Sequence, residues 1–157
     1  KARLNNVREY KFKGKRKNDG EWVYGCYLKR WAGIGYKHFI HDGLWEHEVD
    51  PDTVGEFTGR YDKNGNEVYE KDIIAFEVWH GGVEHFVAEM EAEKQGKKIN
   101  WVRPHVILFN KYGAFCMKPI EFMDDESWHG YEIPAADKIE IIGTVHDNPE
   151  LLKEGSV

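Results

Sequence analysis

The sequence has few of the residues that usually carry catalysis or cross-linking. Only two of its 157 residues are cysteines, Cys26 and Cys116, and without a Cys-x-x-Cys pair they predict neither a disulfide framework nor a cysteine zinc site. Each stands beside an aromatic residue, so we expect reduced, half-buried thiols. The only serines, Ser127 and Ser156, lie outside any Gly-x-Ser-x-Gly motif, and no phosphate-binding loop occurs. We therefore expect a protein that is not an enzyme and needs no cofactor.

Long apolar runs are also missing. None approaches the roughly 18 residues of a membrane span, and no signal-peptide core is present. We expect a cytoplasmic protein with no membrane partner. Prolines are few, five against sixteen glycines, while aromatic residues make up 14% of the chain. This composition favours a β-rich fold with many turns.

Charge is unevenly distributed along the chain. Residues 1–30 carry a formal charge of +7, which leaves −13 for the rest of a chain whose net charge is −6. Such a basic segment can bind an anionic partner, or it can dock on the acidic surface of a second copy. A net acidic chain disfavours general nucleic-acid binding. A homo-oligomer, or a complex with another protein, is therefore the favoured expectation.

Short alternating segments separated by glycine turns predict the fold. Residues 10–27 form a hairpin around an Asn-Asp-Gly turn, and about five strands follow between residues 60 and 146. They include 72–80, 84–90, the pair within 101–123, and 138–147. We expect a β-rich lobe over 1–60, a small closed barrel over 61–146, an exposed excursion over 89–100, and a short C-terminal helix or tail over 147–157.

One stretch, TVGEFTGRYDKNGNEVYEKDIIAF at 53–76, is rich in acids, amides and glycines and invites a calcium interpretation. Counted from Asp62, however, Glu67 falls where an EF-hand loop needs glycine, and Ile73 falls where it needs glutamate. Asn64-Gly65 suits a two-residue hairpin turn instead. The stretch therefore predicts a well-specified turn followed by a strand that begins at Asp72.

Eight histidines raise the alternative of a metalloprotein, based on His38, His41, His47 or His85. His38 and His41 are three residues apart on a predicted strand, so their side chains point to opposite faces. No recognised zinc-ligand spacing is present. We therefore predict no metal site.

The basic N-terminal segment supplies a second alternative, a nucleic-acid or protein contact surface. Aromatic residues interleaved with cations can stack on bases and pair with phosphates, although the same alternation is typical of a half-buried strand. The candidate contact residues are Lys11, Lys13, Lys15, Arg16, Lys17, Trp22 and Trp31.

Three blocks in order along the chain resemble the YopX family of phage and prophage proteins: REYKFKGKRKNDGEWVYG at 8–25, VDPDTVGEFTGRYDKNGNEVYEKDII at 49–74, and IEIIGTVHDNPELL at 139–152. The resemblance spans nearly all of residues 1–157 as a single unit. It implies an SH3-type β-barrel with a smaller β-rich N-terminal lobe, and no established activity. Its signature residues are structural: Thr53, Gly55, Thr58, Gly59, Asp62, Asn64, Gly65, Tyr69, Asp72, Gly143, Asn148 and Pro149.

Some positions depart from the family pattern. Lys71 stands where the family usually has glycine, which puts in doubt any turn that needs a positive φ there. Thr144 replaces the commoner asparagine, and residues 85–100 form an enlarged loop. The resulting expectation is a non-enzymatic phage or prophage accessory protein of the host cytoplasm, which acts by binding or self-assembly.

Overall fold

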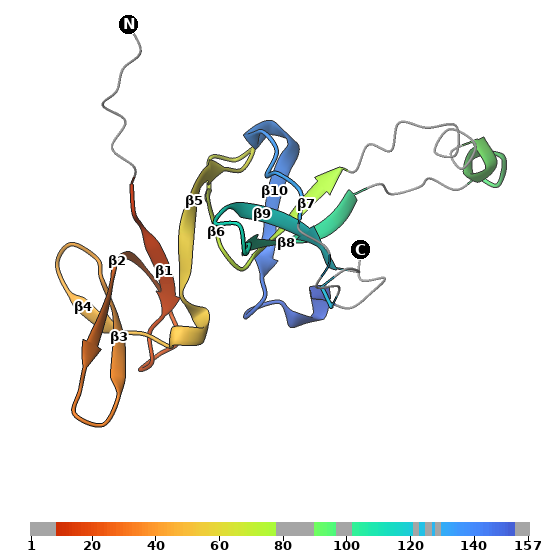
Figure 1. Ribbon diagram of the computed structural model, residues 1–157. Coiled ribbons are helices and arrows are strands. Elements are labelled where there is room, and N and C mark those ends of the chain that lie inside the picture. Colours follow the sequence, from red (N-terminus) through yellow and green to blue (C-terminus); the bar gives the residue numbers. More distant parts are fainter. Residues whose placement is uncertain are drawn as a thin grey trace, which may run out of the picture.

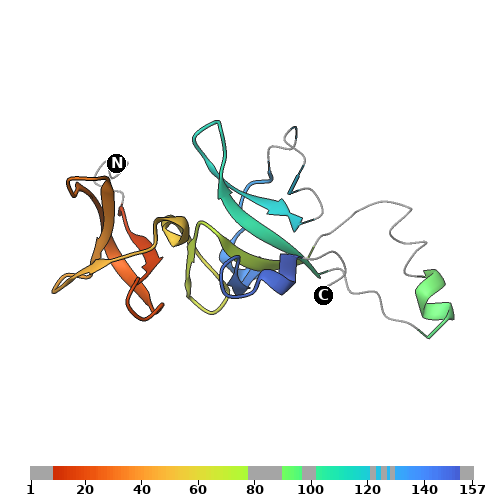
Figure 2. The same ribbon diagram turned by 90° about the horizontal axis from the view of Figure 1, so that it is seen from below.

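The computed structural model describes residues 9–77, 90–96, 102–120, 123–124, 127 and 130–152. The fold is mainly β and consists of two antiparallel sheets, as the composition predicts. Figures 1 and 2 show the two sheets side by side. The described part of the predicted 89–100 excursion is a short helical segment at 90–94, followed by a turn at 95–96.

The six-stranded sheet has the order β4-β3-β2-β1-β5-β6. Its strands are β1 (Phe12–Lys15), β2 (Trp22–Trp31), β3 (Tyr36–His41), β4 (Glu46–Glu48), β5 (Gly55–Tyr61) and β6 (Glu67–Tyr69). The predicted N-terminal hairpin is confirmed, with Lys13 opposite Tyr24 and Lys15 opposite Trp22. This sheet continues beyond residue 60, because β6 pairs with β5.

The four-stranded sheet has the order β10-β7-β8-β9. Its strands are β7 (Asp72–Glu77), β8 (Val102–Phe109), β9 (Phe115–Pro119) and β10 (Ile139–Thr144). Within the described residues this sheet is open, with β10 and β9 at its edges, and no closed barrel forms. Residues 84–89 of the strand predicted at 84–90 lie outside the described residues, and its last residue, Met90, begins a helical segment instead.

Apolar side chains cover both faces of the four-stranded sheet. Consecutive Ile73 and Ile74 on β7 are both fully buried. Because neighbouring strand residues point to opposite faces, they belong to different clusters. Ile74 packs with Val68 of β6, which ties the sheets together, whereas Ile73 packs with Leu151 from the C-terminal end. A separate cluster around Ile40 forms a core on the six-stranded sheet.

Three 3-10 turns complete the described fold: η1 (Pro51–Thr53), η3 (Ala136–Lys138) and η4 (Pro149–Leu152). Asp50 caps η1 by accepting a hydrogen bond from the Asp52 amide. Of the C-terminal helix or tail expected over 147–157, the described residues include the single turn η4. Among the described residues, no helix has the length and apolar character needed to cross a membrane.

The β5–β6 connection differs from the two-residue turn that Asn64-Gly65 predicts, because it contains five residues, 62–66. The carboxylate of Asp62 accepts hydrogen bonds from the amides of Asn64 (2.9 Å) and Asn66 (2.8 Å). It also accepts one from Ile141 on β10, at 3.3 Å. A buried acid therefore organises a longer loop and attaches it to the second sheet.

The two cysteines are free thiols, as expected, but neither is half-buried. Cys26 is exposed and Cys116 is buried. Burial raises the pKa of the Cys116 thiol, so it stays protonated and unreactive.

Candidate functional site

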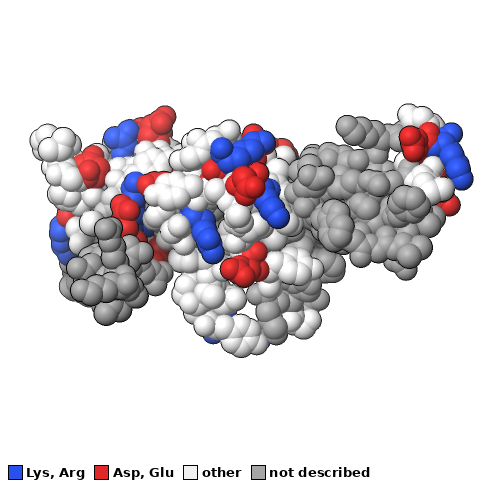
Figure 3. Space-filling model, turned by 90° about the horizontal axis from the view of Figure 1, so that it is seen from above, with Lys and Arg blue, Asp and Glu red and all other residues white. Residues whose placement is uncertain are grey.

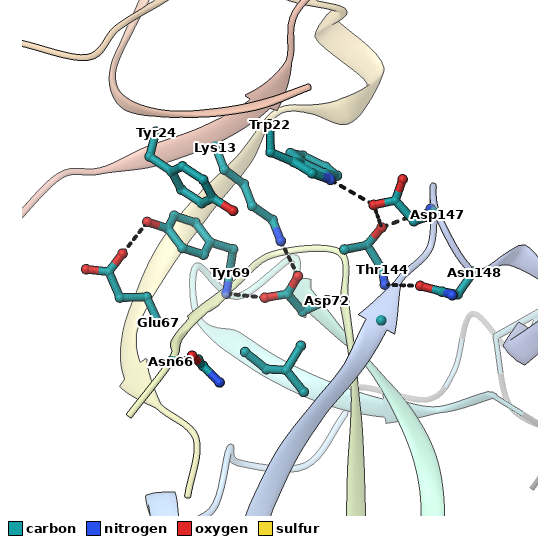
Figure 4. A pocket seen from close by; sticks show the side chains of 12 residues that line it. Lys13, Trp22, Tyr24, Asn66, Glu67, Tyr69, Asp72, Thr144, Asp147 and Asn148 are labelled. Carbon is teal, nitrogen blue, oxygen red and sulfur yellow. Dashed lines mark hydrogen bonds and ion pairs between the residues drawn. The ribbon is translucent and has the colours of Figure 1, made fainter. Parts of the chain in front are cut away.

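A pocket of about 460 Å³ lies between the two sheets. Strands β1, β2 and β6 form one side of it, and β7, β10 and the turn after β10 form the other (Figure 4). Aromatic rings and charged groups share its walls. The lining residues are Lys13, Trp22, Tyr24, Asn66, Glu67, Tyr69, Asp72, Ile141, Gly143, Thr144, Asp147 and Asn148.

A buried ion pair between Lys13 of β1 and Asp72 of β7 forms the floor of this pocket and links the sheets. Their side chains are only 7% and 1% exposed. The other carboxylate oxygen of Asp72 accepts the Tyr69 amide at 2.8 Å. The Lys13 ammonium lies 4.8 Å from the ring centroid of Trp22 and 5.2 Å from that of Tyr69. Burial raises the pKa of Asp72, and Lys13 opposes that rise.

Asp147, in the turn after β10, makes a second connection between the sheets. Its carboxylate accepts hydrogen bonds from the Trp22 indole (2.7 Å) and the Thr144 hydroxyl (3.1 Å), and it forms an ion pair with Lys15. Burial opposes ionisation of Asp147, but these three donors outweigh it and lower the pKa of the carboxyl. Asp147 is therefore a carboxylate at neutral pH and holds the indole in place.

Glu67, at the start of β6, also lines the pocket. It accepts the Lys11 ammonium at 2.7 Å and the Tyr69 hydroxyl at 2.6 Å. Burial and then the bond to Glu67 raise the pKa of Tyr69. The three acids of the pocket are thus each paired with one lysine of β1 or the residue preceding it.

Tyr24 differs from its neighbours in the pocket. Its ring packs on Tyr69 with centroids 5.7 Å apart, and its hydroxyl points toward the Lys13 side chain (Figure 4). Within the described residues this hydroxyl makes no hydrogen bond. Burial, then the charges of Asp72, Glu67 and Asp147, raise the pKa of Tyr24. The hydroxyl therefore remains protonated and can donate.

All five cations of the predicted contact cluster form ion pairs within the chain. Their partners are Glu67 for Lys11, Asp72 for Lys13, Asp147 for Lys15, Asp19 for Arg16 and Glu48 for Lys17. Accordingly, Figure 3 shows charges of both signs intermixed where the described surface is visible. The basic segment therefore neutralises acidic residues of its own chain, and four of these five acids lie beyond residue 30.

The two predicted aromatic contact residues are separated in space. Trp22, at the start of β2, lies in the pocket, while Trp31, at the end of β2, is 60% exposed. The sequence predicts both as contact residues, but only Trp22 lies beside the second sheet.

Four residues that the sequence marks as structural also line the pocket: Tyr69, Asp72, Gly143 and Asn148. Others make structural contacts elsewhere; Thr53, for example, accepts the Lys15 amide at 2.8 Å. Sequence reasoning missed Tyr24, Asn66, Glu67, Ile141, Thr144 and Asp147 as site residues. All six lie within the three blocks that carry the family resemblance, but the blocks do not indicate that segments more than 100 residues apart meet in one pocket.

Lys71 adopts φ = 70°, so the turn that suits glycine is retained. Its ammonium donates to the carbonyls of Asp52 (2.6 Å) and Val54 (2.8 Å), which offsets the backbone strain. We expect Lys71→Ala, which loses both bonds and keeps the strain, to be about 1–2 kcal/mol less stable than Lys71→Gly. Urea unfolding of the two variants measures this difference. Equal stabilities would contradict a strained Lys71.

Titration of His146 should make the stability of the folded protein depend on pH. Its ring packs on Trp22, and its buried Nε2 has no hydrogen-bond partner among the described residues. Burial, then Lys71 and Lys15, lower its pKa from the ordinary 6.5, while Asp147 and Asp50 act in the opposite direction. Because the unfolded chain takes up this proton first, stability should fall as the pH drops below 6.5.

Replacing His146 with Phe should remove this contribution, so the stability of the variant should change less with pH. Urea midpoints of both proteins from about pH 7.5 to about pH 5 measure it, because the other histidines contribute equally to each. Parallel curves would show that His146 does not titrate as its burial implies.

Three of the four histidines considered as metal ligands are described by the structure, and each has a different partner. His38 bonds to the Tyr27 hydroxyl at 2.6 Å, while His41 accepts the Gly43 amide and His47 pairs with Asp42. His85 lies outside the described residues. Within the described part of the chain, no group of three or more His, Cys, Asp or Glu residues is arranged to hold a metal.

A comparison with protein-family models identifies one family. The family model described as YopX protein matches residues 11–153. Among solved structures, the crystal structure of protein EF1440 from Enterococcus faecalis is similar, with a TM-score of 0.46 and 19% sequence identity. That similarity covers 94% of this chain and 100% of the other. A search of the curated proteins gives no match.

Proposed function

The chain belongs to the YopX family, and we propose that it is a phage or prophage accessory protein of the host cytoplasm that acts by binding another protein and not as an enzyme. The observation that carries this proposal is the exposed end of the β2–β3 hairpin. There Trp31, Ile34 and Tyr36 are 60%, 101% and 58% exposed. Exposed apolar residues that gather in one place mark interaction sites in soluble proteins.

The geometry of this hairpin end suits a protein partner. The Trp31 and Tyr36 rings pack edge to face, 5.2 Å between centroids, and Lys29 lies 4.4 Å above the Tyr36 ring. The hairpin end projects away from the four-stranded sheet (Figure 1). A rigid strand pair thus presents tryptophan and tyrosine, the residue types that dominate binding energy at protein interfaces.

The first partner to test is a second copy of the chain. We expect light scattering after size-exclusion chromatography to show a dimer or larger oligomer, retained at high salt because apolar contacts are not screened. Replacing both Trp31 and Tyr36 with Ser should weaken association by about 30-fold or more. The matched control is Leu44→Ser with Trp45→Ser, which removes apolar residues that are 83% and 70% exposed at the opposite end of β3.

A monomer under every condition would reject the homo-oligomer. Another partner is then tested by placing a benzophenone amino acid at position 34 and isolating cross-linked proteins from phage-producing cells. The proposal requires one adduct that disappears when Trp31 and Tyr36 are replaced and persists in the Leu44 and Trp45 control. Adducts insensitive to both changes would contradict it.

The nucleic-acid alternative receives less support. Phosphate binding needs unpaired cations, whereas the five cations of the predicted cluster already have acidic partners. We expect fluorescence anisotropy to detect no binding to single-stranded DNA or RNA oligonucleotides at about 50 mM salt. Salt-steep binding under these conditions would restore that alternative.

We also propose the SH3-type barrel that the family resemblance implies. The support for it is the strand order β10-β7-β8-β9, whose three pairings are all antiparallel and whose strands contribute to the Ile74 cluster. An experimental structure that includes residues 78–101 would test whether the sheet closes.

A further inference from the structure

The pocket between the sheets contains hydrogen-bonding groups that the fold itself does not use. The Lys13 ammonium has three donors, and its hydrogen-bond acceptor in the described structure is a single oxygen of Asp72. The Tyr24 hydroxyl has no partner among the described residues. Tyr24 is 45% exposed, so its hydroxyl and the remaining Lys13 donors are available to an acceptor that enters the pocket.

These donors lie close enough to serve one acceptor atom. Lys13 is opposite Tyr24 in the β1–β2 register, and Figure 4 shows the Tyr24 hydroxyl pointing toward the Lys13 side chain. An oxygen placed between an ammonium and a phenol would receive two hydrogen bonds. A carbonyl oxygen has the two lone pairs that this arrangement needs.

The charges of the pocket select against ionic ligands. Glu67, Asp72 and Asp147 are each paired with a lysine, so this group of six side chains has no net charge. An anion would face three carboxylates, and a cation would have to displace a lysine from its partner. Burying an unpaired charge is costly, so a neutral molecule fits best.

The walls favour a flat molecule. Trp22 and Tyr24 line the pocket with partly exposed aromatic rings, while Tyr69, which also lines it, is only 2% exposed. Aromatic side chains stack on planar heterocycles with little dependence on their identity. The 460 Å³ of the pocket is within the range of small-molecule sites.

We propose that this pocket binds a neutral planar heterocycle carrying a carbonyl oxygen, the chemistry of a uracil-type base or its nucleoside. The carbonyl accepts from Lys13 and Tyr24 while the ring stacks on the aromatic walls. The site lies apart from the hairpin end, so it adds a small-molecule ligand to the binding activity proposed above.

Uridine is the probe, and the indole N–H of Trp22 is the reporter, because it donates to Asp147 within the pocket. We expect uridine to shift this ¹⁵N–¹H resonance saturably, with a Kd of about 0.1–1 mM. Adenosine, whose base has no carbonyl, should bind more weakly. Uridine monophosphate should bind no more tightly than uridine, since the nearby cations are paired.

Tyr24→Phe removes only the hydroxyl and should weaken uridine binding about 2–10-fold, the loss expected for one hydrogen bond. Tyr36→Phe, outside the pocket, is the matched control and should leave binding unchanged. Equal urea midpoints would show that both variants fold as the natural protein does. Replacing Trp31 and Tyr36 with Ser should not affect uridine, which separates this site from the protein-binding surface.

Three results would each overturn the proposal: no saturable shift of Trp22 with uridine, adenosine binding equal to uridine, or Tyr24→Phe binding uridine as the natural protein does. The first would mean that the unused donors are satisfied by water. The other two would mean that stacking, without recognition of a carbonyl, accounts for the binding.

Discussion

Replacing Asp72 with Asn is expected to lower the free energy of unfolding by about 3–5 kcal/mol. The amide keeps the size of the side chain and can still accept the Tyr69 amide hydrogen. It removes the negative charge, however, and leaves the Lys13 ammonium buried with a side-chain exposure of only 7%. Breaking one side of a buried pair costs more than the pair contributes, because the remaining charge cannot return to water without opening the fold.

The double variant Lys13→Met with Asp72→Asn is the control that identifies this cause. It removes both charges, and methionine fills the space between Trp22 and Tyr69, so stability should recover to within about 1–2 kcal/mol of the natural protein. Urea unfolding followed by tryptophan fluorescence measures all four members of the cycle. If Asp72→Asn alone costs under about 1 kcal/mol, the pair is not the desolvated link described above.

Replacing Gly55 with Ala should cost about 1–3 kcal/mol or more, although alanine is a minimal change. The added Cβ would lie 2.4 Å from the carbonyl oxygen of Glu70. That oxygen belongs to the backbone just before Lys71 and Asp72, so it cannot move aside without displacing the turn that positions the ion pair. We expect a lower urea midpoint and, because β5 must shift, a perturbed Trp22 environment.

Gly35→Ala is the matched control for this prediction. Gly35 has no positive φ, and nothing lies within 4 Å of an added Cβ. Its substitution should be neutral or stabilise by up to about 1 kcal/mol, because alanine restricts the unfolded chain. If both variants lost the same stability, the contact between the added Cβ at position 55 and the Glu70 carbonyl oxygen would not be the cause of the loss.

Local patterns were sufficient to predict much of the fold. Alternation in 10–27 located the first hairpin, and the strands at Asp72, 101–123 and 138–147 were found in the expected places. The prediction was wrong about the length of the Asn64-Gly65 turn, because the Asp62 carboxylate accepts amides from both the loop and β10. The hydrogen bond to β10, which is distant in sequence, thus outweighs the local preference of Asn64-Gly65 for a two-residue turn.

The site could be predicted only in part. Lys13 and Trp22 were chosen as contact residues for their charge and aromatic character, and both line the pocket. The same reasoning chose Lys11, Lys15, Arg16 and Lys17, whose charges are taken up by acids of the chain itself. The charge of a segment can be counted from the sequence. Which carboxylate pairs with each cation, however, depends on where the fold places acidic residues that are distant in sequence.

By itself, therefore, the sequence determined the family, the mainly β architecture and the turn residues, because these depend on spacings of a few residues. The tertiary structure alone decided that Asp72 meets Lys13, that Asp147 holds Trp22, and that Tyr24 keeps an unused hydroxyl while Trp31 faces solvent. Each of these facts depends on the packing of one sheet beside the other. That packing brings together side chains as much as 132 residues apart, a separation over which no local pattern extends.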